Sequence, residues 1–128
     1  MTSSAAAHRI PDGLLDLYVV HWPRRSFAKV GITKNQRWRL FANHGGRAVS
    51  VWRLPAEVAR QVEQTAHADL RRLFAQAFGT RDEADPYIRC AGGGYLECYT
   101  DDTGTAVQSF VSTVVAAVAP DAEAVNVP

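Results

Sequence analysis

Apolar and polar residues form blocks near the start of the chain that predict two adjoining strands. Residues 14–21 are apolar almost throughout, which is typical of a strand buried on both faces, and residues 27–33 form a second apolar run. Pro23 and the polar residues after it predict a turn between them. We therefore expect a hairpin whose first strand is central in a sheet.

A short helix and a third strand are expected next. Asn35 is a good N-cap for a helix that reaches about His44, where Gly45-Gly46 end it. Residues 49–54 alternate with β-branched side chains, as a strand does.

A long helix is predicted from Pro55 to about Phe74, because proline is favoured at the first position of a helix. Its apolar residues recur at steps of three and four, which places them on one face. They are Ala59, Val62, Ala66, Leu70 and Leu73.

The rest of the chain predicts a loop over 75–94, a candidate short strand over 95–100 and a valine-rich helix over 105–119 capped by Asp101 or Asp102. The expected fold is α/β, with a small, mainly antiparallel three-stranded sheet flanked by helices. One domain is expected over 14–119, between a flexible leader (1–13) and a flexible tail (120–128).

Composition fits one soluble domain. The chain has 128 residues, of which 47% are hydrophobic and 21% charged. No apolar run reaches the roughly 20 residues of a membrane span, and the first residues do not resemble a secretory signal. With only Cys90 and Cys98, a reduced cytoplasmic location is expected, although a disulfide between them stays open. The excess of arginine over lysine is typical of a GC-rich bacterial or phage genome.

Positive charge is concentrated in one part of the chain, although the net charge is only +1. Residues 17–56 contain no Asp or Glu, and their eight cations favour binding of a polyanion such as nucleic acid. The alternative is that they only solvate an exposed surface. These cations are Arg24, Arg25, Lys29, Lys34, Arg37, Arg39, Arg47 and Arg53.

Several of these segments carry chemically active side chains. The two strands hold Tyr18 and the run Lys29-Val30-Gly31-Ile32-Thr33, the following helix holds Arg39, and the long helix holds Glu63 and His67 one turn apart. A hydroxyl, an ammonium, a guanidinium and a carboxylate suit the cleavage of a phosphodiester with one metal ion.

In order and spacing, these residues resemble the GIY-YIG nuclease family. Asp16-Leu17-Tyr18 stand where the family has Gly-Ile-Tyr, and Lys29-Val30-Gly31 stand where it has Tyr-Ile-Gly. Arg39 matches the arginine of the family and Glu63 its metal-binding glutamate. The resemblance covers residues 14–99.

A branch of this family associated with phages is the most similar. It commonly has lysine in place of the second tyrosine, followed by Glu-x-x-x-His, as in Glu63 and His67, and by a terminal motif like Gly-Tyr-Leu-Glu-Cys-Tyr at 94–99. Asp16 departs from the first glycine of the signature. The role of Glu97 within the terminal motif stays open.

The resemblance implies a metal-dependent endonuclease that hydrolyses DNA. Glu63 would hold one Mg²⁺ or Mn²⁺ ion, and Tyr18 would orient or deprotonate the attacking water, with Lys29 lowering the pKa of the phenol. Arg39 would bind the non-bridging phosphate oxygens. His67 would either orient Glu63 or fill the boundary of the core.

Four further residues are candidates for substrate binding. Gly31 would allow close approach of a phosphate, His44 would contact phosphate or help to transfer a proton, and Lys34 and Arg37 would add positive charge. Each has an ordinary structural alternative, as a packing glycine or a solvated surface residue.

The predicted partner is nucleic acid, with DNA favoured over RNA, and no membrane. Specificity would be low, or supplied by a homodimer or a separate targeting protein. Two alternatives stay open: a nuclease-like module that binds nucleic acid or protein without cutting, and an RNA-cleaving toxin or antiphage nuclease. The nuclease hypothesis expects Tyr18, Lys29, Arg39 and Glu63 to converge on one concave face.

Overall fold

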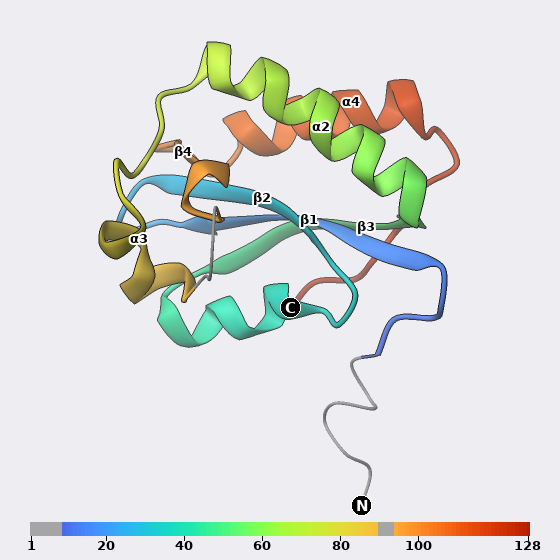
Figure 1. Ribbon diagram of the computed structural model, residues 1–128, viewed down its shortest axis with the longest axis horizontal. Helices are drawn as coiled ribbons and strands as arrows, with labels where there is room; N and C mark the ends of the chain where they lie inside the picture. The colour runs from blue at the N-terminus through green and yellow to red at the C-terminus, as the bar shows by residue number, and fades with distance from the viewer. Residues whose placement is uncertain (1–8, 90–93) are drawn as a thin grey trace, which may run out of the picture.

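The computed structural model describes residues 9–89 and 94–128, so that Cys90, and with it the question of a disulfide to Cys98, lies outside the described residues. Five strands form one antiparallel sheet in the order β4-β2-β1-β3-β5 (Figure 1). The α/β class with an antiparallel sheet is therefore confirmed. The strands are β1 (Leu14–Trp22), β2 (Phe27–Thr33), β3 (Arg47–Pro55), β4 (Cys98–Thr100) and β5 (Glu123–Ala124).

The hairpin of β1 and β2 is the centre of this sheet, as the apolar runs predict. Tyr18 lies opposite Gly31, and Val20 lies opposite Lys29. Because side chains alternate along a strand, Tyr18 faces one side of the sheet and Val19 the other.

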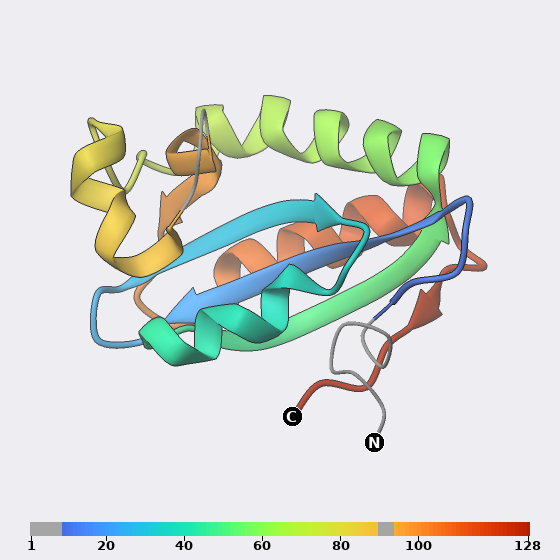
Figure 2. The ribbon, with the colours of Figure 1, turned by 60° about the horizontal axis from the view of Figure 1, so that its bottom comes forward.

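Helices cover both faces. Helices α2 (Ala56–Leu73) and α4 (Ala106–Val118) pack on one face, and η1 (Arg37–His44) and α3 (Arg81–Ile88) lie against the other (Figures 1 and 2). The apolar stripe predicted for the long helix is largely confirmed: four of its five residues are buried, and Leu73 is exposed.

The prediction of three strands is wrong. Strand β4 follows a short 3₁₀ turn, η2 (Gly94–Glu97), and strand β5 lies in the segment expected to be a tail. Both strands are short: β4 lies within the candidate strand expected over 95–100, whereas β5 was not expected and is defined by its pairing, with Trp52 of β3 opposite Ala124.

Two local predictions also differ from the structure. The helix expected from Asn35 is a 3₁₀ helix that begins after Gln36, a residue with φ of 56°, and Asn35 does not cap it. Helix α3 interrupts the expected loop, and the Thr80 side chain caps it by accepting a hydrogen bond from the Glu83 amide.

Strand β2 is paired fully on one side and only partly on the other. Its partner β1 pairs with all seven residues, whereas β4 pairs only with Phe27, Ala28 and Lys29. Within the described part of the chain, residues 30–33 therefore have no strand beyond them. We call this stretch the free edge of β2.

No helix within residues 9–89 and 94–128 combines the length and the apolar character that a membrane crossing needs.

Candidate active site at the free edge of strand β2

Tyr18 and Lys29 meet on the face of the sheet covered by η1. The Lys29 Nζ atom donates a 2.9 Å hydrogen bond to the Tyr18 hydroxyl, and both side chains are buried, with 1% of Tyr18 and 4% of Lys29 exposed. Their closeness follows from the hairpin register, in which Gly31 faces Tyr18 and Lys29 lies two residues along the same side of β2.

Gly31 makes room for this pair. A Cβ atom at this position would lie 2.5 Å from the Tyr18 hydroxyl and 3.0 Å from Lys29 Nζ. The close packing of Tyr18 and Lys29 therefore explains why glycine stands at position 31. This explanation is separate from the predicted contact of Gly31 with phosphate.

Glu97 connects the pair to the edge of the sheet. It directly precedes β4, where Cys98 pairs with Lys29, so its carboxylate lies beside the lysine. Glu97 Oε1 accepts a 2.8 Å hydrogen bond from Lys29 Nζ. The structure thus gives a defined position to the glutamate whose role the sequence left open.

Glu63 and His67 reach the same edge from helix α2. The His67 Nε2 atom lies 3.7 Å from Glu63 Oε2 and 4.0 Å from Glu97 Oε2, and its Nδ1 atom lies 2.5 Å from the Tyr99 hydroxyl. His67 Nε2 is buried and has no hydrogen-bond partner within the described chain.

The expectation that the site residues share one face of the sheet is wrong. Tyr18 and Lys29 lie on the η1 face, whereas α2, which carries Glu63 and His67, packs on the opposite face. The two groups meet around the edge of β2 because Glu97 contacts Lys29 through one oxygen and lies near His67 through the other. We call Lys29, Glu63, His67 and Glu97 the edge cluster.

Burial and charge set the protonation of the Tyr18–Lys29 pair. Burial raises the pKa of Tyr18 above its ordinary value of 10.0 by more than the Lys29 charge lowers it. Burial alone would lower the pKa of Lys29, but the Tyr18 oxygen and Glu97 together raise it. At neutral pH the pair is therefore a phenol and an ammonium, which favours Tyr18 as an orienting group over Tyr18 as a base.

The edge cluster fits a divalent metal ion. One ligand atom from each of Glu63, His67 and Glu97 can be chosen so that all three lie within 4.8 Å of one another. Two carboxylates and an imidazole nitrogen are common ligands, and the unpartnered His67 Nε2 points into the group. The predicted metal ligand Glu63 thus has two further candidate ligands beside it.

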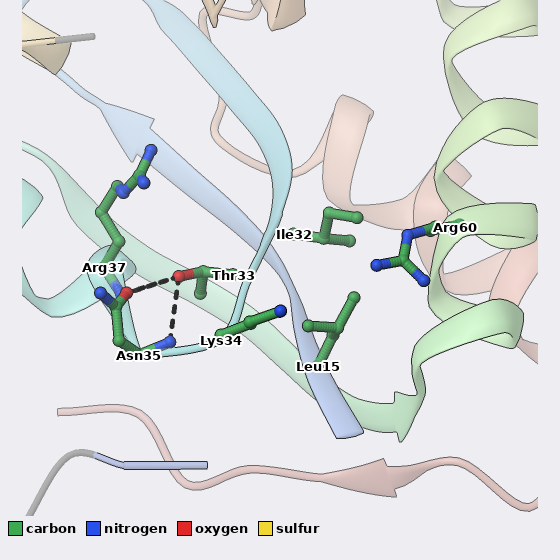
Figure 3. A pocket seen from close by; sticks show the side chains of 7 residues that line it. All are labelled: Leu15, Ile32, Thr33, Lys34, Asn35, Arg37 and Arg60. Atoms are coloured by element: carbon green, nitrogen blue, oxygen red, sulfur yellow. Dashed lines mark hydrogen bonds between the residues drawn. The ribbon is translucent and has the colours of Figure 1, made fainter. Parts of the chain in front are cut away.

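Three cations line a pocket of about 370 Å³ along the free edge of β2. Arg60 comes from α2, Lys34 follows β2, and Arg37 begins η1; Figure 3 shows Arg37 and Arg60 on either side of the strand. Arg60 lies one turn before Glu63 on the same helix, a spacing that could have identified it from the sequence. Burial still raises the pKa of Tyr18, and the charge of Arg37 offsets a small part of that rise.

Arg39 and His44 lie elsewhere on η1. The Arg39 Nε atom donates a 2.6 Å hydrogen bond to Gln36, and the guanidinium lies 4.4 Å from the centre of the Trp38 ring. His44 accepts a hydrogen bond through its backbone oxygen from Trp22, at the end of β1. Among the described contacts of Arg39, none involves the edge cluster, and its predicted role with phosphate stays a prediction.

Comparison with known proteins gives no relative. No family model matches the chain, no curated protein matches it, and no solved structure matches it.

Proposed function

We propose that this protein is a metal-dependent endonuclease that hydrolyses phosphodiester bonds in DNA, as its resemblance to the GIY-YIG family implies. The observation that carries the proposal is the edge cluster itself. A buried hydroxyl–ammonium pair, two carboxylates and an unpartnered imidazole meet beside a pocket lined by three cations.

Hydrolysis breaks one P–O bond and forms another with the oxygen of water. Water loses one proton, and the leaving oxygen gains one. A divalent ion held by Glu63, His67 and Glu97 would neutralise the negative charge that develops on the phosphate. The Lys29 ammonium adds a second positive charge beside it.

The residues of the pocket would hold the substrate strand. Arg37, Lys34 and Arg60 line a pocket with Ile32 and Thr33 of the free edge of β2, so that a sugar-phosphate backbone would follow this edge (Figure 3). A guanidinium binds two phosphate oxygens at once, which suits Arg37 and Arg60 to this task.

Tyr18 would act from behind Lys29. Its hydroxyl accepts a hydrogen bond from Lys29 Nζ and is almost fully buried, so it fixes the direction of the ammonium. Tyr18 is therefore a positioning residue in this conformation, and Lys29 is the nearer group to the ion site.

A cleavage assay tests the proposal. Supercoiled plasmid, single-stranded DNA and RNA are incubated with Mg²⁺, Mn²⁺ or EDTA, using the wild type, Glu63→Gln and the control Asp69→Asn. Asp69 lies on the same helix but is partly exposed, and its ion-pair partner within the described chain is Arg72. We expect metal-dependent nicking of plasmid that Glu63→Gln abolishes and Asp69→Asn retains; cleavage that survives Glu63→Gln would overturn the proposal.

The same assay tests which guanidinium contacts the phosphate. Arg37→Ala is compared with Arg39→Ala, which changes the arginine predicted from the motif. Because Arg37 lines the pocket and Arg39 contacts Gln36 and Trp38, we expect the larger loss of cleavage from Arg37→Ala. A larger loss from Arg39→Ala would contradict this placement of the strand.

One observation favours a second candidate, a nuclease-like module that binds nucleic acid without cutting it. Tyr18 and Lys29 are so deeply buried that neither reaches bulk solvent in this conformation. Tight, salt-dependent binding of DNA with no cleavage in any metal would favour the module. Cleavage of RNA alone would favour an RNA-cleaving toxin or antiphage nuclease.

A further inference from the structure

The imidazole of His67 has an unusual position for a residue that only fills a core. It is 5% exposed, and its Nε2 atom has no partner in the described chain although two carboxylate oxygens lie near it. The distances of 3.7 Å to Glu63 and 4.0 Å to Glu97 are too long for hydrogen bonds. A buried polar atom without a partner lowers stability, so an occupant that satisfies it is favoured.

The spacing suits an ion between these atoms. When each bond to an ion is about 2.1 Å, two ligand atoms lie between about 3 and about 4.2 Å apart, from neighbouring to opposite positions. Both measured distances from His67 Nε2 fall within this range. The side chains would need only a small adjustment to enclose an ion.

The other ring nitrogen fixes the imidazole for this role. Nδ1 lies 2.5 Å from the Tyr99 hydroxyl, and this contact holds the ring in place. When Nδ1 carries the proton and donates it to the Tyr99 oxygen, the lone pair of Nε2 is left for an ion beside Glu63 and Glu97.

We infer that His67 binds the metal ion directly, together with Glu63 and Glu97, and that the site therefore selects transition-metal ions such as Mn²⁺ and Co²⁺ over Mg²⁺. Imidazole nitrogen suits these ions better than it suits Mg²⁺, which prefers oxygen ligands and water. The inference concerns the same site as the proposed function, and it rests on that proposal for the role of the ion in catalysis. It assigns Tyr99 as a positioning residue for His67.

Metal binding is measured on the full chain without nucleic acid. We expect Mn²⁺ and Co²⁺ to bind one ion per chain at least about tenfold more tightly than Mg²⁺ in calorimetry. Pulsed EPR of bound Mn²⁺ should show coupling to a nitrogen nucleus, which reports a histidine ligand directly. His67→Ala should remove the coupling and lower Mn²⁺ affinity at least about tenfold, and should change Mg²⁺ affinity less than about threefold.

Two further variants keep the test decisive. His44→Ala, on η1 and away from α2, should retain both the coupling and the affinity. Tyr99→Phe keeps the ring but removes the hydroxyl that contacts Nδ1, and should weaken Mn²⁺ binding by about tenfold while the coupling persists. Circular dichroism shows whether His67→Ala folds. If it does not, the nitrogen coupling in the EPR spectrum of the wild type and the Mn²⁺ affinity of Tyr99→Phe decide whether His67 is a ligand.

Three outcomes would overturn the inference: bound Mn²⁺ without nitrogen coupling, coupling that survives in folded His67→Ala, or equal affinity for Mg²⁺ and Mn²⁺. Each is distinct from failure of the proposed function. Nitrogen-coupled Mn²⁺ with no cleavage of any nucleic acid would remove the nuclease proposal and leave the metal site. Cleavage with an ion held only by oxygen atoms would overturn the inference about His67 and leave the nuclease proposal in place.

Discussion

Two charged clusters on this sheet, the edge cluster and a group around Asp16, differ in whether their buried polar atoms have partners within the described residues. Asp16, which is fully buried, accepts hydrogen bonds from Trp38 Nε1 at 3.1 Å and from Arg53 Nε and Nη2 at 2.9 and 3.2 Å. In the edge cluster, by contrast, His67 Nε2 has no partner within the described chain. We call the group around Asp16 the Asp16 cluster.

This difference distinguishes a cluster that stabilises the fold from a cluster that is a candidate binding site. A buried carboxylate whose partners are all present holds elements together, here β1, β3 and η1. A group that leaves a buried nitrogen unsatisfied gives up stability, and such sites commonly bind ligands. Asp16, which departs from the glycine of the family signature, therefore has a structural explanation outside the edge cluster.

Removing a carboxylate from the edge cluster should cause the largest effect of these variants. The effect should be on cleavage activity and not on stability. Glu63→Gln keeps the shape of the side chain but removes its charge, so we expect cleavage to fall about 100- to 1000-fold. The free energy of unfolding should change by less than about 1 kcal/mol, because the ion-pair partner of Glu63 within the described chain is His67, whose Nε2 atom lies 3.7 Å away. Plasmid nicking rates and urea denaturation measure the two effects. A large loss of stability would place Glu63 with the structural residues.

Removing the carboxylate of the Asp16 cluster should have the reverse effect. Asp16→Ala leaves the Trp38 indole without its acceptor and Arg53 without its counter-ion, and we expect a loss of about 3 kcal/mol in urea denaturation. Cleavage per folded molecule should change less than about threefold. As a control, Asp69→Ala, which breaks an exposed pair with Arg72, should cost less than about 0.5 kcal/mol. Equal losses in the two variants would contradict the comparison.

Gly31 tests whether the edge cluster depends on close packing behind it. Gly31→Ala places a Cβ atom 2.5 Å from the Tyr18 hydroxyl, so Tyr18 and Lys29 must shift. We expect a loss of about 2 kcal/mol in the free energy of unfolding, with weaker metal-dependent cleavage.

Gly79→Ala is the matched control for this change. Its Cβ atom would meet only the end of the Glu83 side chain, at 3.4 Å. We expect a change in stability of less than about 0.5 kcal/mol. If Gly31→Ala is as mild as this control, then the tight fit around the Tyr18–Lys29 pair has no energetic weight.

The sequence predicts the hairpin and the long helix because their signals are local. The apolar runs of β1 and β2 and the spacing of Val62, Ala66 and Leu70 require no knowledge of distant residues. Strand β5 has no such signal: its two residues are exposed, and the strand exists because it pairs with β3. Helix α3 carries a usable signal, Thr80 three residues before Glu83, which the loop prediction overlooked.

The same distinction between local signals and long-range pairing applies to the candidate site. The pairing of Glu63 with His67 follows from helical spacing, and the closeness of Tyr18 to Lys29 follows from the hairpin. The contact of Glu97 with Lys29 depends on where β4 pairs with β2, nearly seventy residues further along the chain, and no local pattern encodes that register. For the same reason, the sequence could not show that the groups meet around an edge rather than on one face.

Asp101 provides the smallest and most specific test of the comparison, because it is a buried carboxylate outside both clusters and its oxygens are hydrogen-bonded like those of Asp16. Burial alone would raise its pKa, but hydrogen bonds from the Val107 amide, from Thr103 and from the Gly104 amide outweigh burial and hold the pKa below its ordinary value of 3.8. The N-cap residue of α4 (Ala106–Val118) is Thr105, not Asp101 or Asp102 as predicted, but the Asp101 carboxylate accepts the hydrogen bond of the Val107 amide in the first turn of this helix.

A carboxyl whose pKa is lowered on folding stabilises the protein above the pKa of the unfolded chain, and this contribution disappears as the pH falls through the folded value. We expect Asp101→Asn to cost about 1 kcal/mol at pH 7 in urea denaturation. The difference from the wild type should shrink as the pH falls below 3.8. Cleavage at pH 7 should be unchanged per folded molecule, since Asp101 bonds to the first turn of α4 and lies outside the edge cluster. A difference in stability that persists unchanged at low pH would show that packing, and not the charge of a completed carboxylate, holds this end of the helix.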